Sequence, residues 1–174
     1  MAYYRFESEW IVTAPVDKVF DVLVDFESYG AWWPSFHKVK VARGGDSGVG
    51  TRVTYLMKSP LFYSLRSAFS TTEIERPSRI QVAATGDLAG SGTYLLEPDG
   101  KNTSIRYLWN VSTTKRWMNI VAPVMRPLFV WAHHSVMREG GAGLAARLGA
   151  RLVACHSGVA TAPPTRESSS DVLS

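Results

Sequence analysis

The N-terminal part of the chain alternates between apolar and polar side chains. From residue 3 to residue 12 one parity is mostly apolar (Tyr4, Phe6, Ser8, Trp10, Val12) and the other mostly polar (Tyr3, Arg5, Glu7, Glu9, Ile11). Alternate residues of a strand share one face of a sheet, so this period of two predicts a half-buried strand. The apolar parity is largely aromatic, which places large rings on the buried face.

A helical period follows this strand directly. Thr13 is suited to cap a helix and Pro15 to occupy its first turn. The apolar residues then recur at helical spacing, at Val16, Val19, Phe20 and Leu23. A second short helix is expected over residues 26–32, before Pro34, because proline disfavours helical backbone in the residue that precedes it.

Further segments carry strand-like patterns separated by turn residues. They cover residues 36–41, 51–57, 61–75, 79–84, 90–96 and 104–114. The breaks between them include a glycine-rich stretch at 44–50, the Ser59-Pro60 pair and a Glu-Pro-Asp-Gly turn at 97–100. Strands and helices do not alternate here, so we expect an antiparallel meander.

The chain becomes helical from about residue 119. Its apolar positions roughly follow one stripe, comprising Val121, Met125, Leu128, Ala132, Val136 and Leu144. Pro127 lacks an amide donor, which predicts a kink or a start near it, and glycines at 140, 141 and 143 weaken the middle. Leu148 and Leu152 continue the spacing, so we expect the helix to resume and reach about residue 152.

Composition indicates one ordinary globular domain. The 174 residues are 45% hydrophobic and 20% charged. We expect a single domain over residues 1–156 and a disordered tail over 157–174, where the residues are small, polar and include proline. The net charge is +4. Several basic residues late in the chain are spread along the predicted helix, and no motif for nucleic acid accompanies them, which argues against a nucleic-acid partner.

Cysteine usage and the termini bear on location. Cys155 is the single cysteine and cannot form an internal disulfide, and the N-terminus lacks an apolar signal core. We therefore expect a cytoplasmic protein, a monomer or a homodimer. Membrane contact is an alternative that two prolines in the apolar stretch argue against. It would use Trp117, Met118, Ile120 and Trp131, with Arg116 and Arg126 nearby.

Several motifs carry a resemblance to a known family. They are Ala-Pro-Val-Asp-Lys-Val-Phe at 14–20, Phe-x-x-Tyr-x-x-Trp-Trp-Pro at 26–34, Gly-x-Gly-Thr at 48–51, and a helix block that runs from Ala122-Pro123 to Gly143-Leu144. On these motifs residues 3–152 resemble the START-type helix-grip superfamily (SRPBCC), in its polyketide cyclase/dehydrase and lipid-transport branch.

The resemblance implies an α+β helix-grip fold. In it a curved antiparallel sheet of about seven strands wraps around a long C-terminal helix, and two short helices follow the first strand. It also implies a tunnel-like cavity between sheet and helix, with no bound cofactor. Related chains often carry Asn and Asp beside the helix histidine, where this chain has Ala132 and His134.

Large side chains on the strands and on the helix are the candidates for lining this cavity. The ligand-binding candidates are Trp10, Tyr55, Tyr94, Tyr107, Trp109, Phe129, His133, Val136 and Met137. Trp32 and Trp33 are expected at the cavity mouth, one packed inward and the other exposed or gating entry. Trp131 is a further candidate for wall or core. A solid core and a walled cavity would both bury such rings, so both interpretations stay open.

Two residues are candidates for chemistry. His133 shares a helix face with Phe129 and Val136, and imidazole exchanges protons near neutrality. Arg66, if it points inward, would hold a carboxylate or polarise a ketone; if it points outward, it is a surface charge. His133 and His134 point about 100° apart on a helix, and no spacing of metal ligands is present, so we expect no metal site.

Two functions are therefore open. The first, which we favour, is binding of a hydrophobic small molecule such as a lipid, a fatty acyl chain or a polyketide, which needs only apolar walls. The alternative is a polyketide cyclase, aromatase or dehydratase-like enzyme. That enzyme needs at least two polar groups that converge in the interior.

Overall fold

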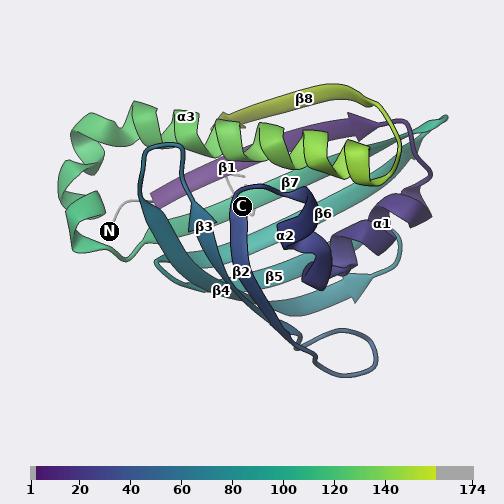
Figure 1. Ribbon diagram of the computed structural model, residues 1–174, viewed down its shortest axis with the longest axis horizontal. Helices are drawn as coiled ribbons and strands as arrows, with labels where there is room; N and C mark the ends of the chain where they lie inside the picture. The colour runs from purple at the N-terminus through teal and green to yellow at the C-terminus, as the bar shows by residue number, and fades with distance from the viewer. Residues whose placement is uncertain (1–2, 160–174) are drawn as a thin grey trace, which may run out of the picture.

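One antiparallel sheet holds the described residues together (Figure 1). The computed structural model describes residues 3–159. Within them the sheet has eight strands in the order β2-β3-β4-β5-β6-β7-β1-β8. The strands are β1 (Tyr3–Val12), β2 (Phe36–Ala42), β3 (Arg52–Lys58), β4 (Ser64–Glu75), β5 (Arg79–Gly86), β6 (Leu88–Asp99), β7 (Asn102–Thr113) and β8 (Leu152–Val159).

The aromatic parity of β1 faces the interior, as its alternation predicts. Tyr4, Phe6 and Trp10 are all buried. Strand β1 pairs antiparallel with β7, which sets Phe6 opposite Trp109. Aromatic rings from neighbouring strands thereby meet on one face of the sheet.

Four helical segments pack on or beside this face. They are α1 (Val16–Val24), the 3-10 turn η1 (Phe26–Ser28), α2 (Tyr29–Trp32) and α3 (Arg116–Arg147). Figure 1 shows α3 running along the sheet as its longest helix, with α1 and α2 near one end. This is the expected α+β helix-grip arrangement. No helix within residues 3–159 is both long and apolar enough to cross a membrane.

Glycines let α3 approach the tryptophans closely. A Cβ on Gly140 would meet the Trp33 indole at 2.5 Å, and a Cβ on Gly141 would meet the Trp10 indole at 2.9 Å. A Cβ on Gly143 would collide with the backbone carbonyl oxygen of Trp32. Glycine thus costs helix propensity here but permits close packing of α3 on its neighbours.

The end of α3 and the strand after it differ from the prediction. The helix ends at Arg147, and Gly149 adopts a positive φ of 61°, a conformation that ends helices. Leu152 therefore begins β8 instead of extending the helix. Strand β8 pairs antiparallel with β1, which sets Cys155 opposite Trp10.

This strand is the eighth, where about seven were expected. Its last three residues, 157–159, fall in the region for which the sequence predicts a disordered tail. The remainder of that tail, residues 160–174, lies outside the described residues.

Candidate ligand-binding cavity

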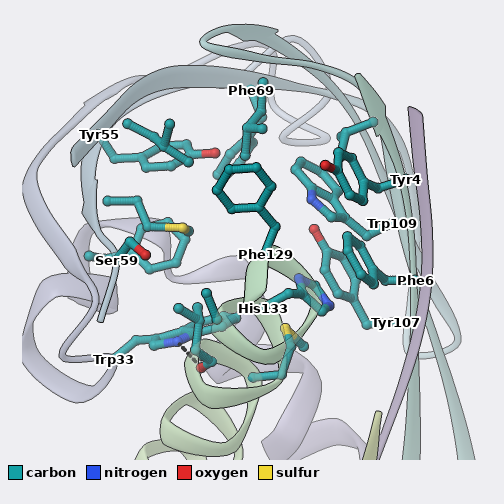
Figure 2. A pocket seen from close by; sticks show the side chains of 18 of the residues that line it. Tyr4, Phe6, Trp33, Tyr55, Ser59, Phe69, Tyr107, Trp109, Phe129 and His133 are labelled. Carbon is teal, nitrogen blue, oxygen red and sulfur yellow. Dashed lines mark hydrogen bonds between the residues drawn. The ribbon is translucent and has the colours of Figure 1, made fainter. Parts of the chain in front are cut away.

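A cavity of about 110 Å³ lies between α3 and the inner face of the sheet. Figure 2 shows aromatic side chains around it, with the sheet bending around the helix. Its walls come from the strands β1 to β7, from the segment between Phe26 and Trp33, and from α3. Among the described residues that line it, none is Asp, Glu, Lys or Arg. Such a space favours apolar molecules.

Phe129 stands at the centre of this cavity. Its ring extends from α3 between the strands in Figure 2. It makes edge contacts with Tyr63 and Tyr4, at centroid distances of 6.1 and 6.5 Å. The ring therefore occupies space that a ligand would otherwise fill, and it limits the free volume.

His133 lies one helical turn after Phe129 and also faces the cavity. Its ring stacks on Phe6 with centroids 3.8 Å apart and an angle of 13° between the planes. Its Nε2 atom is buried and has no hydrogen-bond partner among the described residues. Burial, with a smaller contribution from His134, lowers the pKa of His133 to about 3. The imidazole is therefore neutral at physiological pH.

Tyrosines form most of the polar surface of the cavity. Tyr94 and Tyr107 stack with centroids 4.2 Å apart, and the Tyr29 hydroxyl donates to the carbonyl oxygen of Leu23 at 2.7 Å. Burial is the largest cause that raises the pKa of the hydroxyls of Tyr29, Tyr55, Tyr94 and Tyr107. These groups remain neutral phenols, able to donate hydrogen bonds.

Most of the ligand-binding candidates meet in this cavity. Its lining includes Tyr55, Tyr94, Tyr107, Trp109, Phe129, His133, Val136 and Met137. Trp10 is not in the lining, although it is buried with 1% of its surface exposed. Its ring packs edge-on against Trp33 at 5.5 Å, so Trp10 belongs to the core beside the cavity.

The two adjacent tryptophans are both buried, where one was expected to be exposed or to gate entry. Trp33 lines the cavity and its Nε1 donates to the carbonyl oxygen of Val136 at 2.9 Å. Trp32 is outside the lining, and its Nε1 donates to the hydroxyl of Ser28 at 3.2 Å. The close approach of α3 buries both indoles, which the sequence pattern alone did not indicate.

Arg66 points away from the cavity, which corrects its candidacy as an inward group. On β4 the buried residues Leu65, Ser67 and Phe69 occupy the opposite parity, and Arg66 is exposed. Large apolar residues on that parity were the available signal for which side of β4 faces the cavity. Trp131, a candidate for wall or core, is 50% exposed on α3.

Sequence reasoning left several lining residues out of the candidate list. They include Tyr4, Phe6, Tyr29, Phe36, Tyr63 and Phe69. The alternation of β1 already placed Tyr4 and Phe6 on the inner face. Tyr29 and Phe36 reach the cavity through the path of the chain around α2, and local periodicity does not show that path.

A sheet that grips one long helix over an apolar void defines a helix-grip protein. The chain belongs to the family described as polyketide cyclase/dehydrase and lipid transport, which matches residues 4–149. This confirms the resemblance inferred from the motifs. No curated protein matches the chain by sequence.

Solved structures with low sequence identity share the fold. The Zhui aromatase/cyclase from Streptomyces is 14% identical, with a TM-score of 0.71, and the match covers 85% of this chain and 94% of that one. A protein from Thermus thermophilus is 16% identical, with a TM-score of 0.66 and coverage of 84% and 99%. Ara h 8.0201 is also 16% identical, with a TM-score of 0.62 and coverage of 85% and 99%.

Proposed function

We propose that this protein binds a hydrophobic small molecule in the cavity beneath α3. The observation that carries this proposal is the cavity itself, aromatic and free of charged side chains among the described residues. Family membership supports it, because the family description includes lipid transport. We place the protein in the cytoplasm, since its single cysteine suits a reducing compartment.

The volume of the cavity limits the size of the ligand. About 110 Å³ is comparable to engineered apolar cavities of about 150 Å³ that hold one benzene. A larger ligand requires Phe129 to move, because its ring stands in the middle of the space. The ligand is therefore a single ring, or a longer molecule that displaces this side chain.

Uptake of the neutral fluorescent probe N-phenyl-1-naphthylamine tests the proposal. We expect saturable fluorescence enhancement, reduced in Ala132→Leu because Ala132 lines the cavity. The matched control is Ala142→Leu, the same change at an exposed position of α3. Absence of uptake of both this probe and the single-ring molecule toluene by the folded protein, or equal loss in both variants, would contradict a ligand site beneath the helix.

A cyclase-like enzyme is the second candidate. Its support is His133, a neutral imidazole with an unpaired ring nitrogen beside several tyrosine hydroxyls. One structural neighbour is named an aromatase/cyclase. Turnover of a poly-β-ketone substrate that disappears in His133→Phe, while probe uptake persists, would support this candidate. Turnover unaffected by that change would remove His133 from it.

A further inference from the structure

Two buried polar atoms on one wall of the cavity have no partner. The Nε2 of His133 and the hydroxyl of Tyr4 make no hydrogen bond among the described residues. Phe6 stacks between them, 3.8 Å from His133 and 5.7 Å from Tyr4 by ring centroids. Buried polar groups are rarely left unpaired, because the loss of water is then uncompensated. This wall therefore lacks a hydrogen-bonding partner that a ligand can supply.

The cavity also offers nothing to balance a negative charge. Its described lining contains neither Lys nor Arg, and His133 is neutral. Arg126 is the cation that contacts this wall, but its guanidinium lies 5.7 Å from the centre of the Tyr4 ring and is not in the lining. A carboxylate placed inside would lose its hydration without gaining an ion pair.

We infer that the ligand is an uncharged, mainly apolar molecule with a hydroxyl group that hydrogen-bonds to His133 Nε2. This inference rests on the proposed function and names the ligand class. A hydroxyl group fits either tautomer of His133, because it donates to a bare nitrogen and accepts from a protonated one. Free fatty acids, with their carboxylate, are excluded.

Three one-ring probes matched to the cavity volume test this inference: toluene, p-cresol and 4-methylbenzoate. Dissociation constants come from NMR titration at pH 7.5. We expect p-cresol to bind about fivefold to tenfold more tightly than toluene, as one buried hydrogen bond gives. We expect 4-methylbenzoate to bind at least about 100-fold more weakly than p-cresol.

Variants test whether the preference for p-cresol over toluene depends on the nitrogen of His133. His133→Phe keeps an aromatic ring on Phe6 but removes the nitrogen, so the affinity ratio of p-cresol to toluene should fall to about one. His133→Leu also removes the nitrogen, and serves as a second variant if the first does not fold. The matched control is His134→Phe, because His134 is the neighbouring histidine outside the lining, and it should keep the ratio.

The outcomes separate the two proposals. If toluene, p-cresol and 4-methylbenzoate all fail to bind, both this inference and the proposed function are overturned. If toluene binds but p-cresol gains nothing, or if 4-methylbenzoate binds equally well, only the ligand class is wrong. A preference for p-cresol that survives both variants would place the hydrogen bond elsewhere and overturn the role of this wall.

A second inference concerns the outer face of α3. Five large apolar side chains recur there every three or four residues and are all exposed: Trp117, Ile120, Val124, Leu128 and Trp131. We call them the outer stripe. Ile120 is 78% exposed and Val124 82%. Met118, which the sequence groups with such a surface, is instead buried against the core. A continuous apolar stripe of this kind marks an interaction surface.

The hairpin between β3 and β4 adds to this surface. Phe62 at its tip is fully exposed, and the adjacent Tyr63 contacts Trp117 edge-on at 5.7 Å. Trp117 in turn packs against Phe129 at 6.4 Å. The outer stripe and the hairpin tip therefore lie next to the residue at the centre of the cavity.

The segment that carries the outer stripe is basic in sequence, although its Lys115 is ion-paired with Asp87 of another segment. No Asp or Glu occurs from residue 100 to residue 138, whereas six Lys or Arg residues do. Arg116, next to Trp117, is exposed, whereas the guanidinium of Arg126 lies over the ring of Tyr4 on the side of α3 that faces the sheet. An apolar surface beside an exposed arginine, in a segment without acidic residues, is complementary to lipids with anionic headgroups. Tryptophan at two of the five positions suits a membrane interface.

We propose that the outer stripe and Phe62 dock onto an anionic lipid surface. Co-sedimentation with phosphatidylcholine vesicles, with and without one quarter phosphatidylglycerol, tests this. We expect binding about tenfold stronger or more to the anionic vesicles, weakened by salt. Ile120→Ser combined with Val124→Ser should abolish it. The matched control is Tyr3→Ser combined with Val153→Ser, which changes two exposed apolar residues elsewhere.

Results from the vesicle experiment and from a test of self-association can each overturn membrane docking. Equal binding to neutral vesicles, no binding to either, or equal loss in both double variants would overturn the proposal. Analytical ultracentrifugation addresses a second copy of the chain as the occupant. A dimer that the Ile120 and Val124 changes dissociate would overturn the membrane as the partner of this face.

Discussion

The imidazole of His133 lies flat on the ring of Phe6, with ring centroids 3.8 Å apart. The contact joins the helix to the first strand and forms one wall of the cavity. It also removes His133 from water, which is the main reason for the lowered pKa of this residue. A titratable group is thus built into a surface that is otherwise aromatic.

Stability should decrease as the pH is lowered, because His133 is buried in its neutral form. In the unfolded chain its pKa is near 6.5, and in the folded protein burial lowers the pKa to about 3. Its contribution is therefore present above pH 6.5 and is lost progressively as pH falls toward 3. Between pH 7 and pH 5 this residue alone should account for a loss of about 2 kcal/mol. Urea unfolding at the two pH values measures it.

His133→Phe is the comparison for this measurement. The variant lacks the titrating group, so its loss of stability between pH 7 and pH 5 should be smaller by about 2 kcal/mol. The carboxylates titrate in both proteins, so their effect on stability cancels when the two losses are compared. Equal sensitivity of the two proteins would show that His133 is not held neutral by burial.

Removing the ring of Phe129 should enlarge the cavity and improve uptake of larger molecules. We expect Phe129→Ala to bind N-phenyl-1-naphthylamine about fivefold more tightly than the parent, because the ring no longer has to be displaced. Unfolding free energy should drop by about 3 kcal/mol, since a buried aromatic is lost. Phe129→Leu should lie between the two. Weaker probe binding in Phe129→Ala would mean that the ring holds the ligand instead of limiting its size.

Gly143 should not tolerate a side chain. Ala in place of Gly in an open helix stabilises by about 1 kcal/mol, but here the added Cβ would collide with the Trp32 carbonyl oxygen. We therefore expect Gly143→Ala to destabilise by about 2 kcal/mol. Thermal and urea unfolding check the sign. Gly158→Ala, where a Cβ meets nothing within 4 Å, is the control; a stabilised Gly143→Ala would show that α3 and α2 are not in close contact.

Arg66 should be dispensable for the ligand site. Its side chain is exposed on the outer face of β4, while its backbone N–H donates to the Asp87 carboxylate at 2.7 Å. Arg66→Ala keeps that backbone bond. Probe affinity should change less than about twofold and stability by less than about 0.5 kcal/mol. A fivefold loss of affinity would return Arg66 to the list of ligand-binding residues.

The sheet was predictable because its strands repeat a simple period. Residues 3–12 alternate so regularly that burial follows the parity over the whole strand. Strand β8 was missed for the opposite reason. Leu144, Leu148 and Leu152 keep a helical spacing, and only Gly149 between them signals the end of α3. The pairing of β8 with β1 is a contact between distant parts of the chain, and local pattern carries no information on it.

The sequence predicted which faces of the strands and of the helix line the site, but not the size of the cavity between them. Strand parity and the helix face selected Tyr94, Tyr107, Trp109 and His133, all of which line the cavity. The depth at which each ring sits depends on the distance between α3 and the sheet. That distance follows from the fit of Trp10 on β1 against Gly141, which is set by three-dimensional packing. For this reason Trp10 was placed in the wall although it belongs to the core.

The pairing of β8 with β1 limits how far the chain can be trimmed from its C-terminal side. A chain cut after Gly149 would keep every residue that lines the cavity. It would nevertheless move the edge of the sheet from β8 to β1, and the backbone groups of β1 that now pair with β8 would lose their partners. Strand β8 therefore completes the pairing of β1 while contributing nothing to the pocket.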